Sequence, residues 1–238
     1  RDSSSSSSSS SKHVSAELMK EDGKKAYELQ EFNTAYEKFS RCVEISPEGW
    51  EELPGVLGNR AASLMMLERY VEVIEDCDRA LKLSQISASN LRILDRKGRA
   101  QLTLGQLDQA ESSFGMLKQW CETWLRGVPE EIMCLELLRA AKEGLNLVSK
   151  ARLLYNTLLA WSPSPSDCPI FLGDSDSLLE ITPHMRSAQA LRVNCLLMMH
   201  QWEGAKLYAE SAVLEPHHSV SALYGHPSCR SYVDLDIP

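Results

Sequence analysis

Three stretches of this sequence repeat one pattern: Leu29-Gln-Glu-Phe-Asn-Thr-Ala35, Leu67-Glu-Arg-Tyr-Val-Glu-Val73 and Leu104-Gly-Gln-Leu-Asp-Gln-Ala110. Each holds a turn, then a large residue and, three positions later, a smaller apolar one. The step from the first stretch to the second is 38 residues, and the step to the third is 37. A fourth stretch, Met199-His-Gln-Trp-Glu-Gly-Ala205, fits the same pattern. This spacing indicates an array of similar units that bury apolar faces against one another.

Each unit is expected to be two helices joined by the turn. At a constant distance before the first three turns lies a small residue, and after them lies a residue suited to a core: Gly23, Ala61 and Gly98 before, Phe39, Cys77 and Phe114 after. The small residue lets the first helix approach its partner closely. These units resemble tetratricopeptide repeats. The resemblance implies an all-α helical solenoid of antiparallel helix pairs with a right-handed superhelix.

The remaining segments are less regular. The unbroken serine run from Ser3 to Ser11 cannot bury apolar surface and is expected to be disordered. We expect the first helix to start at Ser15, which would be its N-cap. Residues 49–55 are predicted to be an extended loop, and Pro129 suits the first turn of a long helix. The predicted organisation is a disordered serine tail over 1–14, three repeat units over 15–118, capping or degenerate-repeat helices over 119–161, a Pro/Ser-rich loop over 162–183, a further repeat-like unit over 184–215 and an irregular end over 216–238.

The composition limits the function classes. Lys and Arg number 25 against 33 Asp and Glu, and this net charge of -8 argues against bulk binding to nucleic acid or an anionic membrane. No apolar run approaches the roughly 18–20 residues of a membrane span. The seven cysteines are scattered without a C-x-x-C pair, which favours a reducing compartment over a disulfide framework. We expect a cytoplasmic location, with the nucleus as a second one, and Cys168 as the most exposed thiol.

Sequence patterns of catalysis are absent. The six histidines are dispersed, and no H-E-x-x-H, G-x-S-x-G or phosphate-loop glycine pattern occurs. We therefore expect no catalytic residue, no metal site and no cofactor. An enzyme, such as a thiol or metal hydrolase, is therefore the least favoured function class.

Five polar residues share the groove that stacked helix pairs create along their first helices. Lys20 and Lys24 lie one turn apart in the first unit, and Arg92 and Arg96 lie one turn apart in the third. Asn59 comes from the second unit. Such cations and amides donate charge-assisted hydrogen bonds to carboxylates, and a peptide that ends in an acidic residue presents two carboxylates close together. The groove is therefore predicted to bind an acidic C-terminus.

The same five positions resemble the dicarboxylate clamp of chaperone-binding tetratricopeptide domains, which hold the C-terminal Glu-Glu-Val-Asp of Hsp70 and Hsp90. Lys20 matches the first clamp lysine, Asn59 the clamp asparagine and Arg96 the clamp arginine. Arg92 matches a position that is usually lysine. Lys24 departs from the pattern, because the family has an asparagine there that binds the terminal carboxylate. A lysine can still donate a hydrogen bond, but its charge and length put the chaperone preference in doubt.

A narrower resemblance is to the tetratricopeptide J-domain (DnaJ-type) co-chaperones. It covers most of residues 16–215, including GNRAASLMMLERY from Gly58 and RILDRKGRAQLTLGQLDQAESSF from Arg92. The sequence has no His-Pro-Asp, the J-domain signature, so the resemblance implies only the chaperone-docking part. The leading hypothesis is a co-chaperone or adaptor that binds acidic tails of Hsp70 or Hsp90. The alternative is an assembly scaffold whose groove binds an internal peptide or helix of a partner without a carboxylate clamp.

Overall fold

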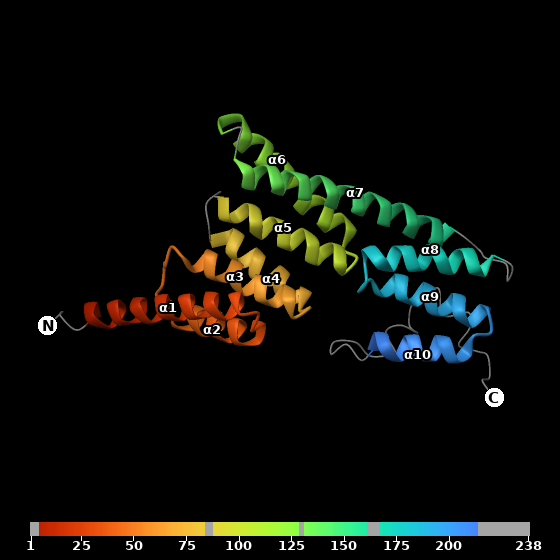
Figure 1. The fold of residues 1–238 in the computed structure, drawn as a ribbon, viewed down its shortest axis with the longest axis horizontal. Coiled ribbons are helices and arrows are strands. Elements are labelled where there is room, and N and C mark those ends of the chain that lie inside the picture. Colours follow the sequence, from red (N-terminus) through yellow and green to blue (C-terminus); the bar gives the residue numbers. More distant parts are fainter. Residues whose placement is uncertain (1–4, 84–87, 129–130, 161–166, 214–238) are drawn as a thin grey trace. The chain divides into compact units, whose positions relative to one another are not determined.

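A computed structural model describes residues 5–83, 88–128, 131–160 and 167–213. Within these ranges the regular structure is entirely helical, as the repeat pattern predicted (Figure 1). The helices are α1 (Ser5–Glu28), α2 (Phe32–Ile45), α3 (Leu53–Met66), α4 (Tyr70–Leu83), α5 (Ala88–Thr103), α6 (Leu107–Gly127), α7 (Ile132–Ala160), α8 (Cys168–Ile181), α9 (Arg186–Met198) and α10 (Trp202–Val213).

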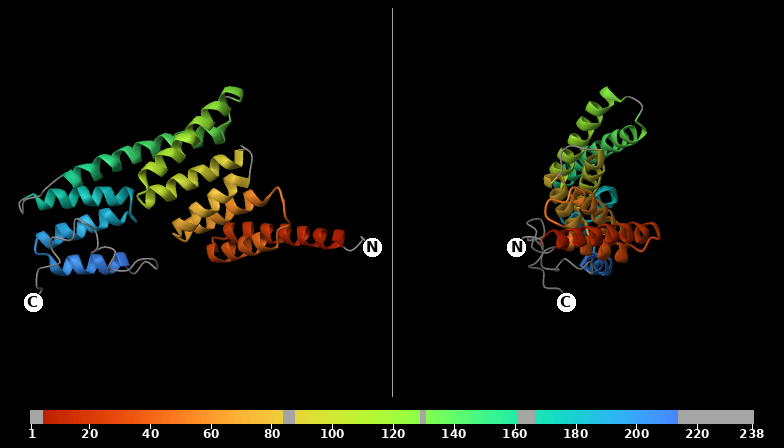
Figure 2. Two further views of the ribbon diagram at one scale, coloured as in Figure 1. Left: turned by 180° about the vertical axis from the view of Figure 1, so that it is seen from behind. Right: turned by 90° about the vertical axis from the view of Figure 1, so that its left-hand side faces the viewer.

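Helices that follow one another in the sequence pack against one another. The chain divides into two compact units, of which the first contains residues 1–101 and 108–145, and the second contains residues 102–107 and 146–238. In the first compact unit α1 packs on α2, α2 on α3 and α3 on α4. In the second compact unit α9 packs on both α8 and α10. Figure 2 shows these antiparallel neighbours from two further directions. This order of packing is that of a helical repeat protein.

The four turns of the repeat pattern share one backbone conformation. The second residue of each stretch has a positive φ: 61° at Gln30, 59° at Glu68, 72° at Gly105 and 58° at His200. In three of these turns the next amide donates to a carbonyl five residues back, at 2.9–3.0 Å, which closes the helix end with a left-handed residue. The register predicted from the sequence is therefore confirmed at every turn.

The small residues before the turns allow close helix packing. A Cβ atom at Gly23 would lie 2.7 Å from Phe39 Cε1, and one at Gly98 would lie 2.8 Å from Phe114 Cε1. Ala61 is fully buried in one core cluster with Cys77. Phe114 also faces Gly144 of α7, where a Cβ would lie 2.7 Å from the ring. The predicted role of the small positions is confirmed, and Gly144 extends it to α7, the helix that follows the third repeat unit.

Two predicted boundaries near the N-terminus are wrong. Helix α1 begins at Ser5, in the segment expected to be a disordered tail, so Ser15 lies inside the helix and does not cap it. A helix that is already formed gains one hydrogen bond for each added residue, and serine opposes this only weakly. Helix α3 begins at Leu53, within the loop expected over 49–55, because Pro54 is compatible with a first turn.

The segment predicted to be a Pro/Ser-rich loop over 162–183 contains a helix. Helix α8 starts at Cys168 with Pro169 in its first turn, and it buries Phe171 and Leu178. A proline before a run of apolar residues can open a helix as well as interrupt one, and here the apolar residues decided the outcome. Cys168, expected to be the most exposed thiol, is fully buried. Pro129 and the predicted end over 216–238 lie outside the described residues.

The sequence left open whether the helices over 119–161 cap the three repeats or form a degenerate repeat. Helix α7 is continuous from Ile132 to Ala160, so the region after Pro129 is a single helix and not several. Its first part, to Leu145, belongs to the first unit and its second part to the second. In the portion of the chain that the structure describes, no helix is both long and apolar enough to cross a membrane.

Replacing Gly105 by alanine is expected to lower the free energy of unfolding by about 2 kcal/mol, because the residue is left-handed and a Cβ would lie 2.4 Å from Met185 Cγ. The matched control is Gly173→Ala in α8, where a Cβ would meet nothing within 4 Å. The control is expected to raise the free energy of unfolding by about 0.5–1 kcal/mol. Denaturant unfolding of both variants measures this, and equal effects would contradict the strained-turn argument.

Candidate functional site

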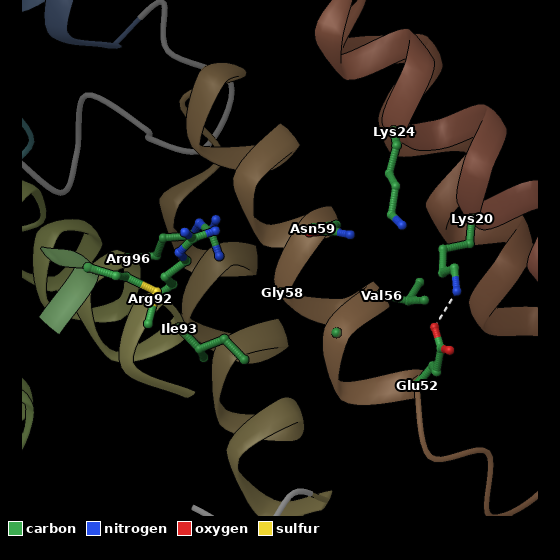
Figure 3. A pocket seen from close by; sticks show the side chains of 11 residues that line it. Lys20, Lys24, Glu52, Val56, Gly58, Asn59, Arg92, Ile93 and Arg96 are labelled. Atoms are coloured by element: carbon green, nitrogen blue, oxygen red, sulfur yellow. Dashed lines mark hydrogen bonds and ion pairs between the residues drawn. The ribbon is translucent and has the colours of Figure 1, made fainter. Parts of the chain in front are cut away.

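The five residues that the sequence singled out line a single open pocket of about 420 Å³. Helix α1 contributes Lys20 and Lys24, α3 contributes Asn59, and α5 contributes Arg92 and Arg96. Figure 3 shows the α1 lysines on one side of the pocket and the α5 arginines on the other, with Asn59 between them. The structure therefore brings all five side chains together, and all of them belong to the first compact unit.

Helical spacing and one glycine explain how these side chains meet. Each cation pair is separated by four residues, which places both members on one face of a helix. Gly58 precedes Asn59 and lies against α5, where a Cβ would be 3.2 Å from Ile93 Cγ1 and 3.8 Å from an Arg96 guanidinium nitrogen. The missing side chain lets α3 approach α5, so that Asn59 and the two arginines line the same pocket.

The pocket also has an apolar floor that the sequence analysis missed. Val56 is fully buried, Ile93 is almost fully buried, and Met133 of α7 completes the lining together with Gly55. A signal was present for two of these residues, since Val56 and Ile93 precede Asn59 and Arg96 by one helical turn. Met133 had no such signal, because its helix follows a segment without the repeat pattern. A ligand here meets apolar surface below the polar groups.

Lys20 is held by carboxylates of its own chain. It is 7% exposed and pairs with Glu17 at 2.5 Å and with Glu52, while its Nζ lies 5.8 Å from the Trp50 ring centroid. Burial alone would lower the pKa of Lys20, but the hydrogen bonds that it donates to Glu17 and Glu52 raise the pKa above its ordinary value. Lys20 is therefore a charged and almost fully buried side chain whose positive charge is balanced by Glu17 and Glu52.

Lys24 is the exposed member of the α1 pair. Its Nζ lies 2.8 Å from an Oε1 atom of Glu21, one turn earlier on the same helix, and both side chains are about half exposed. Exposed pairs of this kind contribute little, on the order of 0.3–0.5 kcal/mol, so Lys24 can exchange Glu21 for another anion easily. The residue that departs from the clamp pattern thus remains available to a ligand.

The arginines of α5 differ from the lysines of α1. Arg92 is exposed at the rim and Arg96 is half-buried, and neither has an ion pair or hydrogen bond within the described ranges. Burial lowers the pKa of Arg96 below its ordinary value, because the loss of water outweighs the attraction of nearby groups such as Asp95, which pairs with Arg99 instead. A partly desolvated guanidinium that lines a pocket and forms no ion pair is a candidate binding group for an anion.

Arg60, the neighbour of Asn59, has a different role. Its guanidinium donates to both carboxylate oxygens of the buried Asp76, at 2.5 and 2.7 Å, and joins α3 to α4. These bonds are the largest cause of a raised Arg60 pKa. Arg60 does not line the pocket, which agrees with its omission from the predicted site.

The thiols and possible metal ligands of the described residues do not form a reactive centre. All six described cysteines are buried. Burial raises the pKa of Cys42 to about 11 and that of Cys77 to about 12, so both are protonated at neutral pH and are poor nucleophiles. Among the described residues, no three His, Cys, Asp or Glu side chains gather where they could hold a metal ion.

Known proteins resemble this chain in sequence and in fold. Human DnaJ homolog subfamily C member 7 is 26% identical over 219 residues, which are 92% of this chain and 40% of the human protein. Hsp70-Hsp90 organizing protein 3 of Arabidopsis thaliana is 32% identical over 91 residues, 37% of this chain and 16% of that protein. The chain thus spans well under half the length of these relatives. No protein-family model matches the chain.

A solved structure shows the fold. The P58(IPK) TPR domain superposes with a TM-score of 0.64 at 19% sequence identity, over 88% of this chain and 55% of that one. At this identity the likeness concerns the fold alone. The described helices therefore have the tetratricopeptide-repeat architecture that the sequence resemblance implied.

Proposed function

We propose that this tetratricopeptide-repeat chain, which resembles human DnaJ homolog subfamily C member 7, is a co-chaperone or adaptor that binds acidic C-terminal tails of Hsp70 or Hsp90. The observation that carries the proposal is Arg96, a half-buried cation without a counter-ion in the described residues, beside Lys24 and Asn59. The Arabidopsis relative is named for Hsp70 and Hsp90, which supports the identity of the chaperones. In this proposal the chain acts by binding, not by catalysis, in the cytoplasm and also in the nucleus.

The terminal residue of such a tail would meet the α5 side of the pocket. Its two carboxylates would accept hydrogen bonds from Arg96 and Asn59, with Arg92 and Lys24 as further donors. Each charge-assisted bond is worth roughly 1.5–3 kcal/mol net, and apolar side chains of the tail would cover the floor formed by Val56 and Ile93. Two or three such bonds amount to about 3–9 kcal/mol, which supports a modest and reversible affinity.

A second candidate function has one observation in its favour. Lys20 and Lys24 already pair with carboxylates of their own chain, so half of the cation cluster has a partner without any ligand. A scaffold that binds an internal helix or peptide of an assembly partner would need no terminal carboxylate. The two functions differ in whether the chemical state of a peptide end matters.

Titration calorimetry with a peptide that ends in Glu-Glu-Val-Asp tests the difference. The free acid is expected to bind at least about ten-fold more tightly than the C-terminal amide, because amidation removes one of the two carboxylates. Higher salt is expected to weaken binding moderately, since the site is partly exposed. Equal binding of acid and amide would favour the scaffold, and an absence of binding would contradict the proposed function.

A further inference from the structure

Glu52 is a pocket residue that the sequence analysis did not consider. It immediately precedes α3, lines the pocket, and points its carboxylate at Lys20 (Figure 3). The Glu52 side chain is 53% exposed, whereas that of Lys20 is 9% exposed. An anion of this chain therefore occupies one of the cations of the proposed binding pocket.

The contact is exchangeable on the Glu52 side. Glu52 stands at the N-cap position of α3, yet its side chain makes no capping hydrogen bond there. Its side-chain partner in the described residues is Lys20 alone. Lys20 has a second partner, Glu17, which comes from its own helix and does not line the pocket. If the Glu52 side chain moves into solvent, Lys20 keeps its ion pair with Glu17, so its ammonium group is not left without a partner.

The two sides of the pocket are thus unequal in charge. On the α1 side, Lys20 faces Glu52 and Glu17. On the α5 side, Arg92 and Arg96 have no carboxylate partner within the ranges that the structure describes. An incoming carboxylate meets two guanidinium groups without a described ion pair at α5, but at Lys20 it must compete with a carboxylate that is already in place.

We propose that Glu52 is a specificity-determining residue of the pocket, an intramolecular competitor that occupies Lys20 and limits the number of carboxylates that a ligand can place there. This inference rests on the proposed function. A tail is anchored first by Arg96 and Asn59, and it gains Lys20 only by displacing Glu52. Glu52 consequently lowers the affinity for acidic tails in general and makes the α5 side the main determinant of binding.

The test compares Glu52→Gln with Glu51→Gln, a matched control. Glu51 is the preceding residue, is exposed and does not line the pocket, so both variants change the net charge equally. Glu52→Gln is expected to tighten binding of a free-acid Glu-Glu-Val-Asp peptide about three- to five-fold and to steepen its salt dependence, because Lys20 becomes available. Glu51→Gln is expected to change affinity less than two-fold. Thermal melting confirms that both variants are folded.

Each outcome decides between the two levels of the proposal. An unchanged or weaker affinity of Glu52→Gln, with binding by the original protein, overturns the competitor and leaves the proposed function standing. An equal gain in Glu51→Gln also overturns it, because the effect would then be one of net charge. If neither the original protein nor either variant binds the peptide, the proposed function fails and the role of Glu52 fails with it.

Discussion

Replacing Arg96 by methionine is expected to weaken binding of an acidic tail at least about thirty-fold and, at the same time, to stabilise the folded chain. The loss of binding follows from the loss of the central charge-assisted donors. The gain in stability follows from the surroundings of Arg96, since burial lowers its pKa and its guanidinium forms no ion pair within the described residues. An apolar side chain of similar length avoids that desolvation, and we expect the free energy of unfolding to rise by about 0.5–1 kcal/mol.

The opposite signs make this result diagnostic. A residue kept for folding loses stability when it is truncated, whereas a residue kept for a ligand loses binding and often gains stability. Arg79→Met is the control, because Arg79 is exposed on α4 and does not line the pocket. Calorimetric titration and denaturant unfolding of both variants give the two quantities. A destabilised Arg96→Met that binds normally would show that Arg96 has a structural role and no part in the site.

Truncating Phe114 to alanine is expected to lower the free energy of unfolding by about 3–5 kcal/mol, a large part of the 5–15 kcal/mol typical of a domain. Phe114 is 1% exposed, and its ring fills the space left by Gly98 of α5 and Gly144 of α7. Neither glycine has a side chain that could close the resulting cavity. The loss therefore includes the cavity as well as the buried apolar surface.

The control for this prediction is Phe32→Ala, the same chemical change at a half-buried position. Phe32 makes an edge-on contact with Tyr27, at 5.4 Å between ring centroids, but it is not among the atoms that a Cβ at any described glycine would meet first. A cost of about 1–2 kcal/mol is expected there. Chemical denaturation followed by far-UV circular dichroism measures both. If the two variants cost the same, the glycines around Phe114 do not set the packing of the third unit.

The pocket has the cations of the clamp pattern but differs from that pattern at Lys24. Lys24 stands where the clamp resemblance has an asparagine, and the structure shows that its partner is an exposed glutamate of the same helix. Together with Glu52 on Lys20, this gives a pocket whose α1 side carries more charge of both signs than a simple cationic cleft would. Selection among acidic tails would then depend on which local carboxylates a tail displaces.

The repeat units were predictable because their signals are local. A turn residue with a positive φ, a small residue seven positions earlier and a large residue two positions later all lie within one helix pair, and Gln30, Glu68 and Gly105 take the same conformation. Helix α8 escaped prediction for the converse reason. Its prolines favoured a loop, and the burial of Phe171 and Leu178 that favours the helix depends on neighbours outside the segment.

The sequence by itself determined the all-helical repeat, its register and the set of five polar residues around the pocket, since helical spacing and the period of the units place them on one face. Only the tertiary structure decided which of those cations have partners. Glu52 and Lys20 are 32 residues apart, and no helical or turn spacing relates them. Lys20 is paired because packing brings the residue before α3 onto α1. Arg96 has no described ion pair, whereas Asp95, the carboxylate beside it in the sequence, pairs with Arg99.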